Sequence, residues 1–428
     1  MNFATENLVF DPQIIRRFDV NGPRYTSYPT ADRFVEAFDS DAAKHWLGKR
    51  NIGGISRPLS LYFHIPFCNT ICYYCACNKI ITKDHGRSAK YIRYLGREID
   101  IVGGLIEGGP KVEQLHWGGG TPTFLARDEM ATLMGMLRGG FEFSPQAEVS
   151  IEVDPRKVGA DTIAFLAELG FNRISVGIQD FDPVVQEAVN RIQTEAETMT
   201  VIAAARANGF VSVNADLIYG LPRQTVAGFS TTLDKVIAVA PDRIALYSYA
   251  HVPHLFKPQR RIVWADLPMA SAKVSMLSRS LDAFTEAGYV YVGMDHFALP
   301  EDALAVAKRQ GRLHRNFQGY STQPDCDLIA LGVSAIGRVG TTYSQNAKTL
   351  EEYYDRLNQG HLPIVRGLAL SRDDLVRRAV IMALMCQGAL TIESVEQAWL
   401  IDFRTYFARE LEQLAEMEQQ GLVDYYIS

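Results

Sequence analysis

The 428-residue sequence predicts an α/β fold: a partial (βα)6 barrel, preceded by an N-terminal extension and followed by a C-terminal, mainly helical domain. Two observations predict this fold. From residue 59 to about 250, short apolar runs alternate with longer amphipathic segments, which is typical of successive βα units in a parallel sheet. Glycines, cysteines and polar residues follow the predicted strands, and in a barrel these positions meet at the carboxyl-terminal rim.

The predicted barrel strands are short and apolar. They cover residues 59–65, 113–117, 148–153, 173–178, 211–218 and 243–249. Segment 88–105 places Ile92, Leu95, Ile99 and Val102 on one face, which is the spacing of a helix that packs on a sheet. Two helices, around 182–190 and 195–208, are expected between the fourth and fifth strands. A further strand, 289–294, follows a long helical run that starts near Pro268.

Composition limits the possible functions. The chain is 47% hydrophobic and 21% charged, as in globular proteins, and its net charge is -6 with no long basic stripe, so nucleic-acid binding is not expected. No apolar run reaches the roughly 18 residues that a membrane span needs, and the N-terminus resembles neither a signal nor a transit peptide. We therefore expect a cytoplasmic protein with reduced cysteines.

The most unusual stretch, "YFHIPFCNTICYYCACNKI" at 62–80, follows the first strand and contains Cys68, Cys72, Cys75 and Cys77 with the spacing C-x3-C-x2-C-x-C. In a reducing compartment this spacing favours metal or redox chemistry over disulfides. Zinc sites usually combine two ligand pairs that lie far apart in sequence, whereas one compact loop suits an iron-sulfur cluster. Three of the thiols can bind three irons of a 4Fe-4S cluster and leave the fourth iron free, but spacing alone does not say which cysteine is not a ligand. Zinc ligands or ordinary buried cysteines remain alternatives, and we expect the isolated Cys326 and Cys386 to be core residues.

Other distinctive residues follow the later strands. "GGGT" at 118–121 lacks bulky side chains, so its backbone can approach a ligand and its N–H groups can meet a carboxylate. Glu152 and Asp154 end the third strand, Gln179 follows the fourth, and Asp216 lies near the end of the fifth. Taken singly, the glycine turn and "EVDP" are more often structural. Their convergence on one predicted rim favours a functional site.

The cysteine spacing after the first of six βα units resembles the radical S-adenosylmethionine superfamily, whose members have a (βα)6 TIM-like partial barrel. The chain also resembles the oxygen-independent coproporphyrinogen III oxidase family from about residue 15 to 424. The motifs that carry this resemblance occur in order: "GPRYTSYPT" at 22–30, "LYFHIPFC" at 61–68, "LHWGGGTPT" at 115–123, "SIEVDPR" at 150–156, "VGIQDF" at 176–181, "DLIYGLP" at 216–222, "GMDHFA" at 293–298 and "LHRNFQGYST" at 313–322.

The resemblance implies roles for individual residues. Cys68, Cys72 and Cys75 would ligate one 4Fe-4S cluster, and Cys77 would be a catalytic thiol that is not a ligand. Tyr62, Gly119 and Glu152 would help to bind the S-adenosylmethionine that sits on the cluster. The positions matching a second S-adenosylmethionine site are Tyr74, Gly120, Thr121, Gln179, Arg191, Asp216 and Ala250, with Ile336 as a further adenosyl contact.

The resemblance further implies an enzyme, a radical S-adenosylmethionine oxidoreductase of haem biosynthesis. It would convert two propionates of coproporphyrinogen III to vinyl groups and give protoporphyrinogen IX, using a 5'-deoxyadenosyl radical. Its expected partners are this substrate and a low-potential electron donor such as a flavodoxin or ferredoxin, and we expect a monomer. Alternatives are a related tetrapyrrole methyltransferase or cyclopropane-forming enzyme, or a non-enzymatic haem chaperone. Such chaperones generally lack the cysteine at the position of Cys77, which counts against that alternative.

A substrate with four propionates carries about four negative charges at neutral pH, yet the chain itself is acidic. Recognition would therefore depend on local guanidinium groups, which bind carboxylates in bidentate fashion. The candidates are Arg16, Arg17, Arg24, Arg260, Arg261 and Arg315.

Four parts of the chain are expected. Residues 1–55 form an N-terminal extension and substrate cover, residues 56–300 the barrel, residues 301–370 a connecting region beside it, and residues 371–428 a helical domain. Ser371 and Thr391 are possible N-caps of helices in the last part. The final "GLVDYYIS" resembles the first strand of a hairpin without its partner, so truncation of this domain is one interpretation.

Overall fold

The computed structural model describes residues 11, 13, 27–50, 57–317, 319–323 and 326–423. All six predicted barrel strands are confirmed, and neighbouring members pair in parallel. They are β1 (Leu59–Ile65), β4 (Val112–Gly119), β5 (Phe143–Val153), β6 (Arg173–Gln179), β7 (Ser212–Tyr219) and β8 (Arg243–Ser248). Their carboxyl ends therefore meet at one rim, as the sequence predicts.

Among the described residues, the sheet extends beyond these strands to twelve in total, in the order β16-β15-β14-β13-β1-β4-β5-β6-β7-β8-β10-β9. β13 (Asp327–Leu331) pairs in parallel with β1, and β14 (Ile336–Val339), β15 (Thr342–Asn346) and β16 (Ile364–Ala369) continue in antiparallel fashion. At the other edge, β10 (His296–Ala298) and β9 (Val290–Gly293) are antiparallel. The expected strand at 289–294 is thus present, whereas the strands within 327–369 were not predicted. The barrel is partial because β9 and β16 do not pair with each other.

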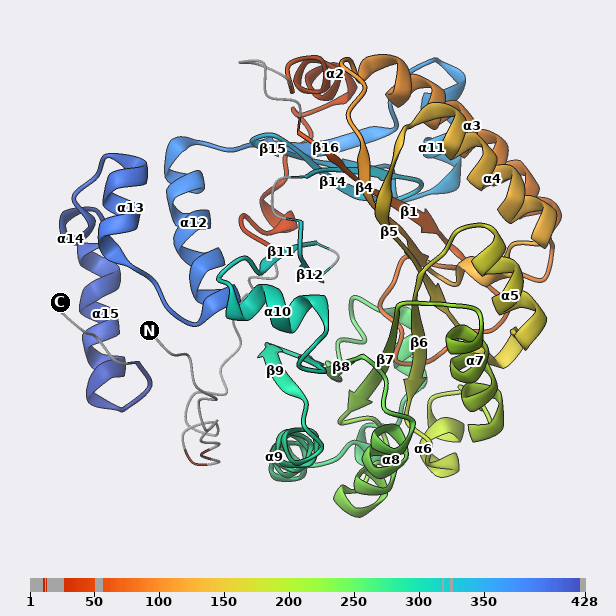
Figure 1. Ribbon diagram of the computed structural model, residues 1–428, viewed down its shortest axis with the longest axis vertical. Helices are drawn as coiled ribbons and strands as arrows, with labels where there is room; N and C mark the ends of the chain where they lie inside the picture. The colour runs from red at the N-terminus through yellow and green to blue at the C-terminus, as the bar shows by residue number, and fades with distance from the viewer. Residues whose placement is uncertain are drawn as a thin grey trace.

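Helices cover the convex side of the curved sheet (Figure 1). They are α3 (Gly86–Leu105), α4 (Arg127–Gly140), α5 (Ala160–Glu168), α6 (Pro183–Ala188), α7 (Glu195–Ala207), α8 (Val226–Val239) and α9 (Ala270–Glu286). The predicted apolar face of α3 is confirmed, since its members, Ile92, Leu95, Ile99 and Val102, are all buried against the sheet. None of the described helices is both long and apolar enough to cross a membrane.

The alternation of side chains along the strands makes the opposite, concave side polar. On β5, Val149, Ile151 and Val153 are buried in the core, whereas the intervening Ser150 and Glu152 are only partly buried. Successive side chains of a strand point to opposite faces, so the polar residues of β5 face the barrel interior. The interior therefore offers polar groups to a ligand while the convex face supplies the core.

Two short strands occupy the concave side, between the sheet and α12 (Arg372–Gln387) (Figure 1). β11 (His314–Asn316) and β12 (Gly319–Ser321) form an antiparallel hairpin, and α10 (Ala303–Arg309) precedes them. Ser321 Oγ donates to Gln114 Oε1 of β4 at 3.1 Å, and Thr322 Oγ1 donates to Glu148 Oε1 of β5 at 3.2 Å. The hairpin is thus tied to the inner face of the barrel.

Within the part of the chain that the structure describes, four helices follow β16: α12, α13 (Ile392–Trp399), α14 (Phe403–Tyr406) and α15 (Ala408–Gln419). Ser371 is confirmed as the N-cap of α12, where it forms a capping box with Asp374, whereas Thr391 occupies an N-cap position without a side-chain bond. Cys386 on α12 and Cys326 are buried, as expected. The final "DYYIS" at 424–428 lies outside the described residues, as do Arg16, Arg17 and Arg24.

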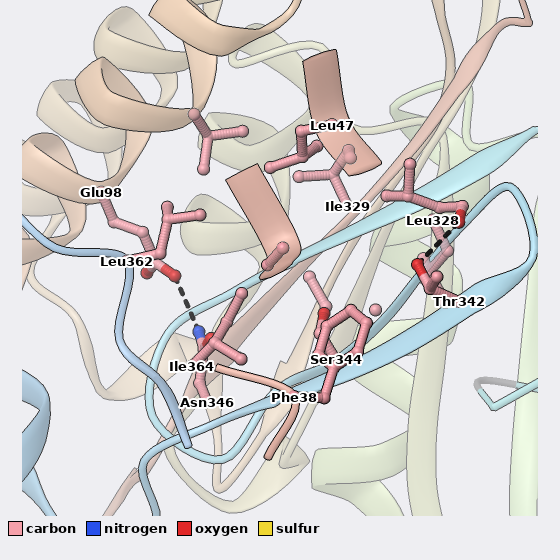
Figure 2. Close-up of a pocket in the computed structure, with 15 residues that line it drawn as sticks. Phe38, Leu47, Glu98, Leu328, Ile329, Thr342, Ser344, Asn346, Leu362 and Ile364 are labelled. Carbon is pink, nitrogen blue, oxygen red and sulfur yellow. Dashed lines mark hydrogen bonds between the residues drawn. The ribbon is translucent and has the colours of Figure 1, made fainter. Parts of the chain in front are cut away.

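A small cavity of about 40 Å³ lies between β13–β16 and the helices α2 (Ser40–Gly48) and α3 (Figure 2). At its wall the buried Glu98 accepts hydrogen bonds from Tyr353 Oη at 2.5 Å, Asn346 Nδ2 at 2.7 Å and the Gly332 N–H at 2.8 Å. Burial raises the pKa of Glu98 to about 7, although these three donors oppose the shift. This group of hydrogen bonds is structural, because it joins α3 to the strands added beyond β1 and to α11 (Leu350–Asn358).

Candidate active site

The cysteine loop begins where β1 ends. β2 (Phe67–Cys68) and β3 (Ile80–Ile81) pair in parallel and hold the two ends of the loop together. Inside the loop, the Cys75 N–H donates to the Cys72 carbonyl at 3.2 Å, and Lys79 Nζ donates to the carbonyls of Cys75 and Cys77. These contacts fold the loop back on itself, so that the four cysteines occupy one small region.

Residues from distant strands fix the loop at the rim. Asn190 Nδ2 donates to the Ile71 carbonyl at 2.7 Å, the Tyr73 N–H donates to the Val189 carbonyl at 2.9 Å, and Gln259 Nε2 donates to the Tyr74 carbonyl at 3.1 Å. These partners follow β6 and β8, which lie across the barrel from β1. The loop position is therefore set by the whole barrel and not only by the strand that precedes it.

The thiols lie in different electrostatic environments. Burial, together with the neighbouring Cys75, Cys72 and Asp154 charges, raises the pKa of Cys68 to about 12. A hydrogen bond from the Cys77 thiol lowers the pKa of Cys75 to about 6, with burial opposing and Lys79 assisting. Cys72 and Cys75 act on Cys68, and Cys77 donates to Cys75, so these thiols lie within electrostatic reach of one another.

The glycine turn packs directly against the segment that leads into the cysteine loop. The Gly120 N–H donates to the Ile65 carbonyl at 2.8 Å, and the Thr121 N–H donates to the Phe67 carbonyl at 2.9 Å. A Cβ atom on Gly120 would lie 2.7 Å from the Phe67 carbonyl oxygen. Gly119 has φ +117°, and a Cβ there would lie 2.7 Å from the His64 ring. Glycine is required at both positions because any side chain would collide with residues 64–67.

Glu152 connects the glycine turn to the interior of the barrel. Its carboxylate accepts the Gly119 N–H at 3.1 Å and contacts His116 Nε2 at 3.2 Å. Tyr62 on β1 stacks on the His116 ring at 5.9 Å and contacts His64 Nδ1 through its hydroxyl at 3.1 Å. Burial tends to raise the pKa of Glu152, but the His116 and Gly119 contacts outweigh it and the pKa is lowered. Glu152 is thus held as a carboxylate although its side chain is still 42% exposed.

The remaining predicted cofactor residues lie along the same rim. Gln179 ends β6 with φ +65°, and Asp216 on β7 accepts hydrogen bonds from Ser175 Oγ and Asn214 Nδ2, each at 2.8 Å. Burial raises the pKa of Asp216 to about 6. Ala250 follows β8 and is exposed, and Ile336 begins β14 directly after the turn from β13. The topology therefore brings these positions to the end of the barrel that carries the cysteine loop.

Comparison with known proteins agrees with this geometry. The sequence profile of the Radical SAM superfamily matches residues 62–236, and that of the HemN C-terminal domain matches residues 370–424. The oxygen-independent coproporphyrinogen III oxidase of Pseudomonas aeruginosa is 50% identical over 98% of this chain and 91% of its own length. The corresponding protein of Escherichia coli K12 is 45% identical, with the same shares covered.

The chain belongs to the oxygen-independent coproporphyrinogen III oxidase family. A solved structure, described as "Coproporphyrinogen III oxidase (HemN) from Escherichia coli is a Radical SAM enzyme", matches with a TM-score of 0.94 and 45% identity over 98% of this chain and 94% of that one. The fold class predicted from the sequence is therefore confirmed.

Members of the radical S-adenosylmethionine superfamily use a 4Fe-4S cluster and S-adenosylmethionine, and the residues present fit these groups. One loop supplies soft thiol donors, and beside it a turn without side chains exposes backbone next to a carboxylate. Among residues 27–50, 57–317, 319–323 and 326–423, no three His, Cys, Asp or Glu side chains are close enough to hold a single metal ion. In a cubane cluster each thiolate binds a different iron, so this finding does not bear on cluster binding.

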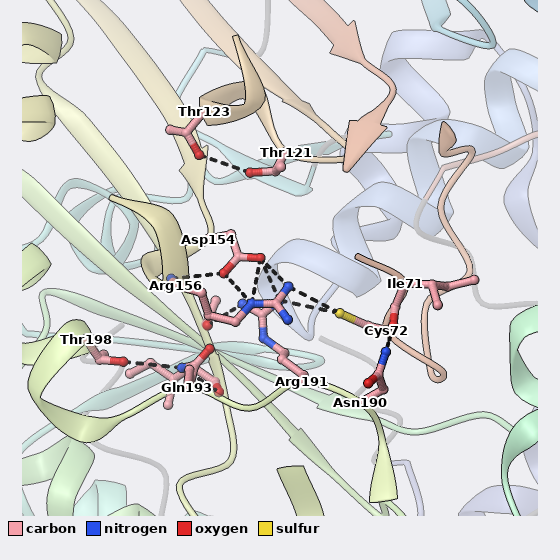
Figure 3. A network of polar contacts seen from close by, with 12 residues as sticks. Ile71, Cys72, Thr121, Thr123, Asp154, Arg156, Asn190, Arg191, Gln193 and Thr198 are labelled. Carbon is pink, nitrogen blue, oxygen red and sulfur yellow. Dashed lines mark hydrogen bonds and ion pairs between the residues drawn. The ribbon is translucent and has the colours of Figure 1, made fainter. Parts of the chain in front are cut away.

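Two arginines approach the sulfur of Cys72 (Figure 3). Arg156 Nη2 lies 3.6 Å and Arg191 Nη1 lies 3.7 Å from Cys72 Sγ. Asp154 orients both, since it accepts Arg156 Nε at 2.9 Å and Arg191 Nη1 at 3.3 Å. Burial would raise the pKa of Asp154, but the two guanidinium groups lower it. Arg191, a predicted cofactor residue, also donates to the Gly177 carbonyl at 2.7 Å.

Sequence reasoning missed several residues of this site. Arg156 lies inside the quoted "SIEVDPR" motif, and its position two residues after Asp154 was the available signal. Asn190 and Gln259 gave no signal, because their role depends on backbone carbonyls of the cysteine loop across the barrel. Tyr247 on β8 is 38% exposed, and it shares a face of the sheet with Asp216, because Asp216 pairs with Ala245, two residues before Tyr247.

Proposed function

We infer that this protein converts two propionate side chains of coproporphyrinogen III to vinyl groups, giving protoporphyrinogen IX in haem biosynthesis. The observation that supports this best is the likeness to the Escherichia coli enzyme, which extends over 98% of the chain at 45% identity. The thiol loop, the glycine turn and Glu152 meet at one rim, which provides the place where such chemistry would occur.

Cys68, Cys72 and Cys75 would hold the cluster, and the turn at Gly119 with Tyr62 and Glu152 would hold the S-adenosylmethionine on it. When bound, the reduced cluster and S-adenosylmethionine would supply a 5'-deoxyadenosyl radical, which would remove a β-hydrogen atom from a propionate; the carboxylate would then leave as carbon dioxide while a one-electron acceptor takes the remaining electron. The protein positions the reactants and excludes other hydrogen donors. Glu152 suits the cationic cofactor because its pKa is lowered and it keeps a negative charge at neutral pH.

Finer assignments are part of the proposal. A second S-adenosylmethionine would bind at Tyr74, Gly120, Thr121, Gln179, Arg191, Asp216 and Ala250, with Ile336 as an adenosyl contact. Asp216 supports this assignment because its carboxylate, fixed by Ser175 and Asn214, faces the interior and can accept from ribose hydroxyls. The electron donor would be a flavodoxin or ferredoxin, and the enzyme a monomer. The four-part division, with residues 1–55 as a cover, is proposed on the sequence alone.

Cys77 is proposed as a catalytic thiol and not a cluster ligand. It is the exposed member of the four cysteines, and its thiol donates to that of Cys75. An exposed cysteine beside the predicted ligands supports a role other than ligation, whereas Cys72 is buried.

The test is an anaerobic assay of the reconstituted protein with S-adenosylmethionine, reductant, a one-electron acceptor and coproporphyrinogen III, following vinyl products and 5'-deoxyadenosine together. We expect both to accumulate, with two vinyl groups per substrate. Protein that cleaves S-adenosylmethionine but leaves coproporphyrinogen III unchanged would contradict the proposal. Tight haem binding without any turnover would identify a haem chaperone instead.

A further inference from the structure

Arg315 on β11 is a buried cation, and two of its three guanidinium nitrogens have no hydrogen-bond partner among the described residues. The residue is 5% exposed, and its guanidinium carbon lies 4.5 Å from the centre of the Tyr320 ring. Within the part of the chain that the structure describes, its Nε and Nη1 atoms are buried without a hydrogen-bond partner. The paired strands β11 and β12 place Arg315 directly opposite Tyr320, so the hairpin itself sets this arrangement.

The other buried arginines each have an ion-pair partner. Among the described residues, Arg50 and Arg191 are the other arginines less than 10% exposed. Arg50 is ion-paired with Asp327 at 3.0 Å, and Arg191 is ion-paired with Asp154 at 3.3 Å. A buried charge normally requires such a partner, because desolvation of an unpaired ion is costly. Arg315 forms no ion pair with a described carboxylate. An anion from outside the chain could neutralise its charge and accept hydrogen bonds from Nε and Nη1.

Aromatic side chains connect Arg315 to the predicted cofactor site. The Tyr320 ring meets His296 edge-on at 5.3 Å, and His296 meets Tyr247 edge-on at 6.1 Å. Tyr247 lines the concave surface near Asp216 and Glu152, and the charge of Arg315 acts on its hydroxyl together with those carboxylates. Arg315 therefore lies on the concave side of the sheet, within electrostatic reach of the cofactor residues.

The surroundings of Arg315 favour an anion. Tyr320 donates its hydroxyl to the Met385 carbonyl of α12 at 3.0 Å, which holds the ring under the guanidinium. Arg378 of α12 contacts the neighbouring His314, and burial together with Arg378 and Arg338 lowers the pKa of His314 to about 3. Asp295 also acts on Tyr320, but more weakly than Arg315 does. A local positive field thus exists inside a chain of net charge -6.

We propose that Arg315 is a carboxylate anchor that binds a propionate of the tetrapyrrole substrate. This proposal rests on the proposed function. The Arg315 Nε and Nη1 atoms have no hydrogen-bond partner among the described residues and can donate to carboxylate oxygens, and the stacked Tyr320 ring fixes the plane of the guanidinium. A tetrapyrrole in this position would have its macrocycle between the β11–β12 hairpin and the rim that carries Asp216 and Glu152. Arg315 would select substrates in which one carboxylate reaches its guanidinium while the reacting propionate lies at the rim.

The experiment measures equilibrium binding of coproporphyrin III, the stable oxidised analogue, by fluorescence quenching without reductant or turnover. Arg315→Met keeps the volume and removes the charge, so we expect binding to weaken roughly 10-fold or more. Arg315→Lys keeps the charge without the planar guanidinium, so its affinity for coproporphyrin III should lie between those of the parent and Arg315→Met. The matched control is Arg97→Met: Arg97 also stacks on a tyrosine, Tyr94, at 4.8 Å, but is exposed on α3. It should bind as the parent does.

Thermal unfolding of the ligand-free protein gives a second readout. If Arg315 only stabilised the fold, its replacement would lower the unfolding midpoint. If the charge serves a ligand, Arg315→Met removes an uncompensated buried ion, and the midpoint should stay the same or rise. A variant that fails to fold, or one that unfolds earlier and binds coproporphyrin III normally, would overturn the proposal. If the parent protein binds coproporphyrin III through Arg315 but forms no vinyl product, the proposed function is refuted and the role of Arg315 in binding a carboxylate is retained.

Discussion

Replacing Gly119 by alanine tests the geometry of the glycine turn. The residue has φ +117°, a conformation that L-residues rarely adopt, and an added Cβ would lie 2.7 Å from the Cε1 and Nδ1 atoms of His64. His64 cannot move away easily, because it is 6% exposed and contacts Tyr62 Oη at 3.1 Å and the Asn78 carbonyl at 2.8 Å. The new methyl group must therefore displace the turn, the ring, or both.

The magnitude follows from two separate costs. Holding a residue with a side chain in a rarely populated backbone region costs about 1–3 kcal/mol, and overpacking a filled interior costs about 1–3 kcal/mol, so about 2–6 kcal/mol is expected. Total stabilities of about 5–15 kcal/mol make this a large change. Part of it would be avoided if the turn moved, but that movement breaks the Gly119 N–H bond to Glu152.

Urea unfolding of the ligand-free protein and S-adenosylmethionine binding by the reconstituted protein measure the two outcomes. Gly119→Ala should unfold at lower urea and bind S-adenosylmethionine weakly. Gly135→Ala is the control, since Gly135 is exposed on α4 and a Cβ there would meet no atom within 4 Å; it should gain up to about 1 kcal/mol. Normal stability together with normal cofactor binding in Gly119→Ala would refute the argument.

Three further predictions concern separate parts of the molecule. Arg156→Gln removes a donor from Cys72 Sγ, so the midpoint potential of the cluster, measured by EPR-monitored titration, should become more negative, and an unchanged potential would contradict this role. Cys77→Ser should retain the visible spectrum of the cluster but lose vinyl formation, whereas loss of the spectrum would make Cys77 a ligand. Burial raises the pKa of Glu98 from 4.5 to about 7, so the folded state keeps a proton that the unfolded state releases. Stability should be fully present below about pH 4.5 and fall by about 3 kcal/mol towards pH 7, and this slope should be absent in Glu98→Gln, as measured by urea unfolding across pH.

The barrel could be predicted from the sequence because its signals are local. A parallel strand that is buried on its convex face has an apolar run, and the helices that cover it have apolar residues at three-to-four spacing, so both are visible without tertiary knowledge. Leu95 and Ile99 illustrate this, since their spacing alone predicted the face that α3 buries. The strands between 327 and 369 were missed because they are short and carry polar residues such as Gln345 and Asn346 at buried positions.

The candidate site could be predicted only in part, for a different reason. Motif spacing identifies the cysteine loop, the glycine turn and the carboxylates at strand ends, because each depends on neighbours in sequence. Arg156 and Asn190 act on the cysteine loop over sequence separations of 84 and 119 residues, so no local pattern reports them. Their roles follow from the barrel, which brings the ends of β1, β5 and β6 together.

Arg315 shows why charge must be placed in space before it can be interpreted. Counting residues gives an acidic chain, which by itself disfavours a substrate with several carboxylates. The hairpin β11–β12 carries Arg315 into the concave side, where the surrounding protein excludes water and the effective strength of each charge increases. One guanidinium in that environment, with no ion-pair partner among the described residues, attracts a carboxylate more strongly than several exposed arginines, whose fields are screened by solvent and salt. Net charge therefore governs the approach of the substrate, whereas the interior of the barrel governs its binding.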